Sequence, residues 1–364
     1  MDNLALYRKY RPQSFSEIIG QEHIIQTLKN ALSSNNASHA YIFSGPRGSG
    51  KTTTARLLAK ALNCRNRKEG ESEPCNKCSS CLEVKDGRSL DLIEIDAASH
   101  RGIDEVRELK EGIRFSPNKE KYKVFVIDEC HMLTKEAVNA LLKTLEEPPS
   151  HAVFILATTE IHKMAPTIIS RCQRFDFRRL EFQEILKRLE HISKKEGAKI
   201  EKPALELIAL HSEGAVRDAE SLLDQVLTFS GKADITKDSI KEMLGLADTA
   251  WASEFSWFLS KRDIKGAFEF LEQSLEKGYD PMELSKTLVS YLRHVLILSI
   301  NPEVVSGFSK EEKETMKNQA EILGYGGLQK ALGLFMDAEN RMKYSSIPQL
   351  PLELAIVDFL KENQ

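Results

Sequence analysis

A glycine-rich segment at residues 45–52, GPRGSGKT, constrains the fold more than any other part of the chain. It fits the pattern G-x-x-x-x-G-K-[ST], with an apolar run before it and a helical pattern that starts near Lys51. A strand, a glycine loop and a helix N-terminus in that order surround a phosphate with backbone N–H groups. In such a loop Lys51 reaches the β- and γ-phosphates, and the Thr52 hydroxyl is a ligand of Mg²⁺. The residues expected to contact a nucleotide here are Gly45, Pro46, Arg47, Gly48, Ser49, Gly50, Lys51, Thr52 and Thr53.

Short apolar runs alternate with helical patterns through the first half of the chain. The runs are rich in Val, Ile and Phe and apolar throughout, which is typical of strands buried on both faces. Alternation of strands with helices implies right-handed crossovers and a parallel sheet. The expected strands are 39–44, 91–95, 122–127, 152–157 and 174–177, and the expected helices are 24–33, 51–62, 102–113 and 135–145.

Beyond residue 180 the strand pattern stops and only helical periodicity remains. A small bundle is expected first, and a second helical block, punctuated by Gly, Pro and Asn, follows it. We therefore predict an α/β domain at 1–178, a helical domain at 179–243 and a second helical domain at 244–364. The expected helices are 181–196, 203–212, 215–229, 236–244, 249–259, 264–277, 281–299, 309–323, 328–344 and 350–361.

The expected strand at 122–127 leads into two carboxylates, Asp128 and Glu129. Asp128 can hold Mg²⁺ through water, and Glu129 can orient and polarise an attacking water. We expect the strand at 152–157 to lie between the loop strand and this acidic strand. Thr158 and Thr159 at its end would then face the γ-phosphate, and one of the two can act as a polar sensor. A pair of strand-forming residues that simply ends a strand is the alternative.

Two arginines are candidates for the positive charge that phosphoryl transfer needs, which another subunit often supplies. Arg171 lies in the segment SRC, before the final strand, and Arg217 opens a helix of the second domain. Spacing alone does not separate either of them from an ordinary surface arginine in a salt bridge.

Four of the six cysteines fall within 18 residues of one another, in polar, turn-rich surroundings. Four thiolates at such spacing can close around Zn²⁺ as a tetrahedron, and a closed site of this kind is structural. Free thiols and an iron–sulfur cluster are the alternatives. The expected ligands are Cys64, Cys75, Cys78 and Cys81.

Charge and hydropathy exclude several classes of protein. The 51 Lys and Arg nearly balance the 54 Asp and Glu, so the surface is not a wholly basic coat for nucleic acid. Residues 1–60, however, hold eight basic and three acidic residues, so a polyanion should meet this part first. The N-terminal residues lack the apolar core of a signal peptide, and no apolar stretch is long enough to span a bilayer. We expect a cytoplasmic protein with no membrane partner.

Together these motifs resemble those of the AAA+ ATPases and, more narrowly, of the gamma/tau subunits of the bacterial DNA polymerase III clamp loader. The resemblance extends from residue 1 to about 230, and the last part of the chain matches only loosely. Besides the phosphate loop and the four cysteines, it rests on YRKYRP (7–12), IGQEH (19–23), HAY (39–41), EIDAAS (94–99), DECHML (128–133), NALLKTLEEPP (139–149), LATTE (156–160) and SRC (170–172).

The resemblance implies an AAA+ ATPase domain, a helical lid at 179–243 and a collar at 244–364 that assembles a ring. Arg11 and Pro12 would border the adenine, Arg171 would reach a neighbouring subunit's ATP in trans, and Arg217 would be the sensor arginine of the lid. The expected ligands are ATP, Mg²⁺ and a structural Zn²⁺. The expected partners are the delta and delta-prime subunits, other gamma/tau copies, the beta sliding clamp and primed DNA.

Three other functions fit parts of the sequence. Asp128–His131 also fits the D-E-x-H pattern of helicases, but such helicases need a second sheet-bearing domain, and residues 180–364 show only helical periods. A ring subunit that does not hydrolyse ATP is a second alternative, and the complete set of loop and acidic residues argues against it. A protein remodeller would need an aromatic pore loop, and residues 96–102 contain no aromatic residue.

Overall fold

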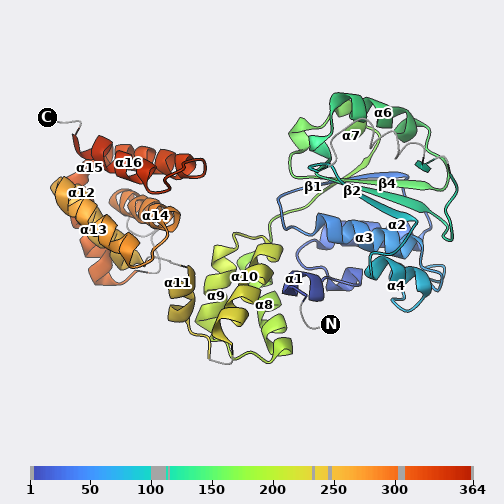
Figure 1. Ribbon diagram of the computed structural model, residues 1–364, viewed down its shortest axis with the longest axis horizontal. Coiled ribbons are helices and arrows are strands. Elements are labelled where there is room, and N and C mark those ends of the chain that lie inside the picture. The colour runs from blue at the N-terminus through green and yellow to red at the C-terminus, as the bar shows by residue number, and fades with distance from the viewer. Residues whose placement is uncertain are drawn as a thin grey trace. The chain divides into compact units, whose positions relative to one another are not determined.

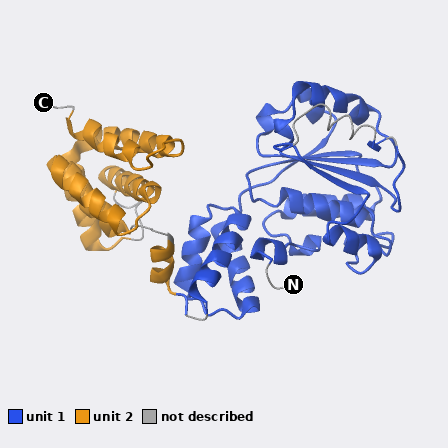
Figure 2. Cartoon of the chain, in the orientation of Figure 1, with its two compact units in different colours: residues 1–235 blue, residues 236–364 orange. Residues whose placement is uncertain are grey.

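The chain divides into two compact units, an N-terminal unit of residues 1–235 and a C-terminal unit of residues 236–364 (Figure 2). The domain boundaries expected near 178 and 244 stay predictions. Most of the helix expected at 102–113 lies outside the described residues. The computed structural model describes residues 4–99, 112–113, 115–231, 234–244, 248–301 and 308–361.

A five-stranded parallel sheet forms the centre of the N-terminal unit (Figure 1). The strand order is β2-β3-β4-β1-β5, so β4 lies between β1 and β3 as the sequence predicted. In parallel strands the carboxyl ends meet at one edge, and the register pairs Ser44 with Thr158 there. The strands are β1 (Ala40–Ser44), β2 (Leu92–Asp96), β3 (Lys123–Asp128), β4 (Ala152–Thr158) and β5 (Gln173–Asp176).

Helices cover both faces of this sheet (Figure 1). Side chains alternate along a strand, so Tyr41 and Phe43 of β1 pack on one face, whereas Ile42 packs on the other. This is why β1, β3 and β4 are mostly apolar along their length, whereas β2 and β5 at the sheet edges carry exposed polar residues. One face carries α2 (Glu22–Ser33), α3 (Lys51–Leu62) and α4 (Ser79–Lys85), and the other carries α6 (Lys135–Glu146) and α7 (Pro166–Ile169).

Three longer helices follow the sheet in the N-terminal unit, and a short N-terminal helix packs on the third of them. The Glu181 and Glu184 side chains form a capping box at the start of the first, and Gly197 ends it with φ 67°. Among the described residues after Asp176, one isolated bridge, between Ile200 and Ile235, is the only strand-like pairing. The helices are α1 (Leu6–Lys9), α8 (Phe182–Glu196), α9 (Lys202–His211) and α10 (Val216–Ser230).

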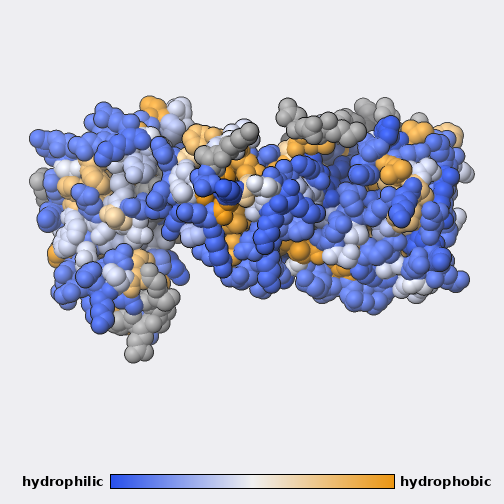
Figure 3. All heavy atoms as spheres, turned by 90° about the horizontal axis from the view of Figure 1, so that it is seen from below, coloured by the Kyte–Doolittle hydropathy of each residue, from blue (hydrophilic) through white to orange (hydrophobic). Residues whose placement is uncertain are grey.

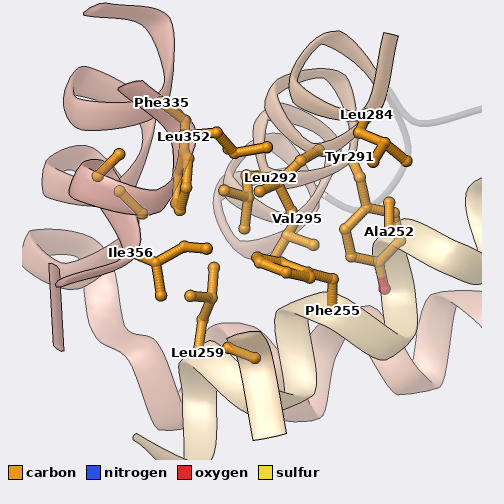
Figure 4. Close-up of a cluster of buried hydrophobic side chains, with 14 of the residues drawn as sticks. Ala252, Phe255, Leu259, Leu284, Tyr291, Leu292, Val295, Phe335, Leu352 and Ile356 are labelled. Carbon is orange, nitrogen blue, oxygen red and sulfur yellow. The ribbon is translucent and has the colours of Figure 1, made fainter. Parts of the chain in front are cut away.

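The C-terminal unit is helical in its described residues and has a core of its own. Phe255, Leu292 and Phe335 come from three different helices and meet in this core (Figure 4). The helices expected at 309–323 and 328–344 form α15, whose backbone leaves helical geometry at Gly324. The helices are α11 (Lys237–Leu244), α12 (Thr249–Lys261), α13 (Ile264–Glu276), α14 (Pro281–Ile300), α15 (Lys310–Met342) and α16 (Leu350–Lys361).

The surface is largely polar, with smaller hydrophobic patches on the face that Figure 3 shows. This agrees with a chain in which 29% of the residues are charged. Among the helices that the structure describes, none is both long and apolar enough to cross a bilayer.

Candidate active site

A pocket of about 550 Å³ lies in the N-terminal unit, beside the carboxyl ends of the strands. It brings together residues that are far apart in the sequence: the N-terminal segment, the phosphate loop, the acidic end of β3 and helix α10. Of the predicted site residues, the pocket is lined by Arg11, Pro12, Arg47, Gly48, Ser49, Gly50, Lys51, Thr52, Thr53, Asp128, Glu129 and Arg217. Gly45, Pro46, Thr158, Thr159 and Arg171 are not among its lining residues.

The phosphate loop needs glycine at two positions for reasons of space as well as backbone conformation. Gly45 has φ 148°, and a Cβ there would lie 2.4 Å from the carbonyl oxygen of Phe177. Gly48 has φ 75°, and a Cβ there would lie 3.0 Å from the Cβ of Ala215. The loop is therefore packed closely against the segments that follow the sheet, and its residues 47–53 line the pocket at the start of α3.

Lys51 is buried within the loop, where its side chain is 5% exposed. Its Nζ donates hydrogen bonds to the carbonyl oxygens of Gly45 at 2.8 Å and Pro46 at 2.9 Å. Burial lowers the pKa of Lys51, and the negative charges of Glu129 and Asp128 oppose that shift. The ammonium group is thus held inside the loop by these carbonyl oxygens, near the negative charges at the end of β3.

Thr52 and Asp128 are in direct contact across the pocket. The Thr52 hydroxyl donates to Asp128 Oδ2 at 2.7 Å, and Asp128 Oδ1 accepts the N–H of Glu129 at 2.9 Å. A hydroxyl and a carboxylate are the oxygen ligands that Mg²⁺ takes at phosphate sites, where it also keeps several waters. The two side chains therefore fit the ion that the sequence predicted for them.

Glu129 follows β3 directly and has an unusual backbone conformation, with φ 46°. A side chain at positive φ is uncommon and carries strain that neighbouring contacts must hold. Here the Glu129 carboxylate accepts hydrogen bonds from the Thr159 hydroxyl at 2.9 Å and from the Thr159 N–H at 3.3 Å. Thr159 therefore orients the carboxylate that faces the pocket.

Thr158 has different neighbours from Thr159. It is fully buried, and its hydroxyl lies 3.0 Å from His131 Nδ1 and accepts the N–H of Glu160 at 3.0 Å. The two threonines that the sequence could not tell apart therefore differ, since only Thr159 contacts Glu129 in the structure. Thr159 is the better candidate for the polar sensor.

We expect Thr159→Val to lower the rate constant of ATP hydrolysis about tenfold and to change ATP affinity little. Valine keeps the shape of threonine but loses one hydrogen bond to a charged acceptor, which is worth about 1.5 kcal/mol or more. Single-turnover hydrolysis and nucleotide titration measure the two effects separately. Thr158→Val is the comparison, because it removes the contact to His131 and should lower stability instead. Equal hydrolysis by wild type and Thr159→Val would contradict the orienting role.

Helix α10 and the N-terminal segment form the remaining wall of the pocket. The Arg217 guanidinium lies 4.8 Å from the centre of the Tyr7 ring, a cation–π contact. A buried ion pair joins Arg188 Nε to Glu220 Oε1 at 2.8 Å, and Arg188 also donates to the Tyr10 carbonyl oxygen. Burial raises the pKa of Glu220, and Arg188 opposes the shift. Sequence reasoning missed Tyr7, Arg188 and Glu220 as pocket residues.

Arg171 lies outside the pocket, just after α7. Its Nη1 donates to the Thr167 carbonyl oxygen at 2.7 Å, and its Nη2 pairs with the Glu146 carboxylate at the end of α6. Its side chain is about one-third exposed, at 32%. This arginine is not among the residues that line the pocket of its own chain, and its role in trans stays a prediction.

The four clustered cysteines converge as their spacing predicts. All four sulfur atoms lie within 4.8 Å of one another, and sulfurs bound to one Zn²⁺ at about 2.3 Å would lie about 3.8 Å apart. Burial opposes ionisation of Cys75, but the N–H groups of Lys77 and Cys78 and neighbouring thiols lower its pKa to about 6. Burial raises the pKa of Cys64 and of Cys81, so the thiolate is favoured at Cys75 and not at these two thiols. The cluster has the four-sulfur donor set that fits Zn²⁺.

The position of β4 between the loop strand and the Asp128 strand, with helices after the sheet closing one pocket, defines an AAA+ P-loop ATPase fold. The RuvB Holliday junction branch migration motor of Thermotoga maritima has a similar structure, with a TM-score of 0.51 at 20% identity. That match covers 85% of this chain and 91% of the RuvB chain.

Sequence comparisons narrow this class to one family. The chain is 37% identical over 364 residues to DNA polymerase III subunit gamma of Buchnera aphidicola subsp. Schizaphis graminum, which covers 100% of this chain and 99% of that protein. It belongs to the DNA polymerase III gamma/tau family. Three family models match the chain. Residues 20–181 match the model described as "DNA polymerase III, delta subunit". Residues 184–232 match "DNA polymerase III clamp loader subunit, ATPase lid domain", and residues 235–362 match "DNA polymerase III subunits gamma and tau domain III".

A longer relative also matches. The chain is 42% identical over 358 residues to DNA polymerase III subunit tau of Bacillus subtilis. That alignment covers 98% of this chain but 63% of the tau protein, so the chain spans less than two thirds of that relative's length.

Proposed function

We propose that this chain is the ATPase motor subunit of a clamp loader, in which ATP binding and hydrolysis drive the loading of a sliding clamp onto primed DNA. One observation carries the enzymatic part of the proposal. The Thr52 hydroxyl contacts Asp128 at 2.7 Å in the same pocket as Lys51 and Glu129, so the phosphate loop and the acidic strand end form one site. Family membership supports the part that concerns the clamp loader.

In this proposal, different pocket residues perform different parts of phosphoryl transfer. Backbone N–H groups of the loop and the Lys51 ammonium bind the triphosphate, and Arg11 and Pro12 border the base. Thr52 and Asp128 would hold Mg²⁺, which would neutralise charge on the phosphate oxygens. Glu129, oriented by Thr159, accepts the proton of the attacking water.

Two arginines couple the nucleotide to the rest of the assembly. Arg217 lies on the wall formed by α10, so its attraction to the γ-phosphate would draw that helix toward the loop. Arg171 does not line the pocket of its own chain and would reach ATP bound to the next subunit. Loss of the γ-phosphate removes both contacts, which shifts the populations of ring conformations.

The partners follow from the family. We propose a ring of gamma/tau copies with delta and delta-prime subunits, assembled through residues 244–364 in the cytoplasm. This ring would bind the beta sliding clamp and hold primed DNA mainly through phosphate contacts, because loading must not depend on base sequence. Cys64, Cys75, Cys78 and Cys81 would hold a structural Zn²⁺.

Hydrolysis by the reconstituted assembly tests this proposal. The chain is mixed with its delta and delta-prime subunits, and phosphate release is measured with and without the clamp and primed DNA. We expect the clamp and DNA together to raise the rate several-fold, and Lys51→Ala to abolish hydrolysis. A rate of phosphate release that is the same with and without the clamp and DNA would contradict the clamp-loading function. Hydrolysis that survives in Lys51→Ala would contradict the proposed site.

A further inference from the structure

The cysteine module, residues 64–85, is connected to a part of the nucleotide pocket that lies far from it in sequence. Glu73, two residues before Cys75, accepts hydrogen bonds from the N–H groups of Phe15 at 2.8 Å and Ser16 at 3.1 Å. The same carboxylate pairs with Lys29 Nζ at 2.7 Å. Hydrogen bonds from two consecutive backbone N–H groups fix the path of the chain at this point.

A second connection runs through a buried lysine. Lys60, on α3 and four residues before Cys64, is 2% exposed, and its charge lies near the Cys81 and Cys64 thiols. Its Nζ donates to Gln13 Oε1 at 2.9 Å. A buried ammonium group is costly unless it is paired and hydrogen-bonded, so this contact is strongly favoured.

The segment that both residues hold, 11–19, forms one wall of the pocket. Gln13 donates to the Arg11 carbonyl oxygen at 2.9 Å and, from its N–H, to the Glu17 carboxylate at 2.7 Å. Phe15, 1% exposed, fastens the middle of the segment to the core. The pocket residues in this wall are Arg11, Pro12, Glu17, Ile18 and Ile19.

The chemistry of this wall differs from that of the phosphate loop. Pro12, Ile18 and Ile19 offer the apolar surface on which a flat nucleobase packs, whereas the loop offers N–H groups and a lysine. Two parts of one ligand are therefore bound by two separate elements. Glu73 and Lys60 form their hydrogen bonds with the segment that carries the apolar wall, at Gln13, Phe15 and Ser16.

We propose that Glu73 and Lys60 are positioning residues through which the cysteine module holds the base-side wall of the nucleotide pocket. The inference rests on the proposed function, because it assumes that the pocket binds ATP. Without these contacts the ligand itself would have to order residues 11–19, and the cost of ordering lowers affinity. The cysteine module, which would hold the proposed Zn²⁺, thus contributes to nucleotide affinity.

The test compares two ligands that share their phosphates. ATP and inorganic tripolyphosphate are titrated against wild type, Glu73→Ala and Glu71→Ala, each with Mg²⁺. Glu71 is the matched control, because its carboxylate lies in the same loop and, among the residues that the structure describes, accepts a hydrogen bond only from the Lys68 N–H. We expect Glu73→Ala to weaken ATP binding about tenfold and to leave tripolyphosphate binding unchanged. Glu71→Ala should bind both ligands as wild type does.

Two further measurements separate positioning from general damage. The zinc content of Glu73→Ala should equal that of wild type, whereas amide hydrogen exchange at Phe15 and Ser16 should be faster. Chelation of the metal from wild type should speed the same exchange and weaken ATP binding to the level of Glu73→Ala.

The outcomes distinguish this inference from the proposed function. Wild-type protein that binds neither ATP nor tripolyphosphate would overturn the proposed function itself. Wild-type protein that binds ATP no more tightly than Glu73→Ala does would overturn the inference alone. Equal weakening of ATP and tripolyphosphate would also overturn it, because a positioned base wall cannot affect a ligand without a base.

Discussion

Substituting glutamine for Glu129 is expected to lower the rate of ATP hydrolysis by about 10²- to 10⁴-fold, the usual contribution of a general base. Glutamine keeps the size of the side chain and can still accept a hydrogen bond from Thr159, but it cannot accept a proton from water. ATP binding depends on the loop and Lys51, so the affinity should change little. Single-turnover hydrolysis together with nucleotide titration measures both quantities.

Glu160→Gln is the matched control for this substitution. Its carboxylate lies 2.8 Å from Lys163 Nζ and 3.4 Å from His131 Nε2, and the residue does not line the pocket. The substitution removes the same charge from the same region. Because the loss of one local charge should have a small effect, we expect hydrolysis to stay within about twofold of wild type. An equal loss in both variants would mean that the effect is electrostatic and that Glu129 is not the base.

The centre of the sheet could be predicted from the sequence because β1, β3 and β4 are apolar on both faces. β3 at Lys123–Asp128, for example, lies within a residue of the expected 122–127. The short helix α4 was missed, since seven residues in a polar loop show no helical repeat of apolar positions. Contacts with α3 and the converging cysteines hold it instead.

The motif residues of the site could also be predicted, but their neighbours could not. Successive residues at a strand end point to opposite sides, so only the structure decides which of Thr158 and Thr159 meets Glu129. The ion pair between Arg188 and Glu220 is not part of any sequence motif that we identified. Its one signal is that Glu220 lies three residues after Arg217, on the same face of α10.

Arg171 lies outside the pocket of its own chain, so a role in hydrolysis requires a second subunit. The guanidinium is bound by the Thr167 carbonyl oxygen and the Glu146 carboxylate, and it does not line its own pocket. To act on a nucleotide it must exchange the carboxylate for a phosphate of the next subunit. A guanidinium can bind a carboxylate or a phosphate, so this exchange would replace the contact between Nη2 and the Glu146 carboxylate with a contact to phosphate. The trans role therefore predicts an effect that exists only in the assembled ring.

We expect Arg171→Ala to reduce hydrolysis stimulated by clamp and primed DNA by about 10³-fold or more in the assembled ring, the range found for arginine fingers. ATP binding by the isolated chain should be unchanged. Arg174→Ala is the matched control, since Arg174 is an exposed arginine on β5 whose Nε pairs with Asp176 at 2.8 Å. Phosphate release by rings that contain each variant measures the difference. Full stimulation in the Arg171→Ala ring would refute the trans role, because no other contact of this residue reaches a nucleotide.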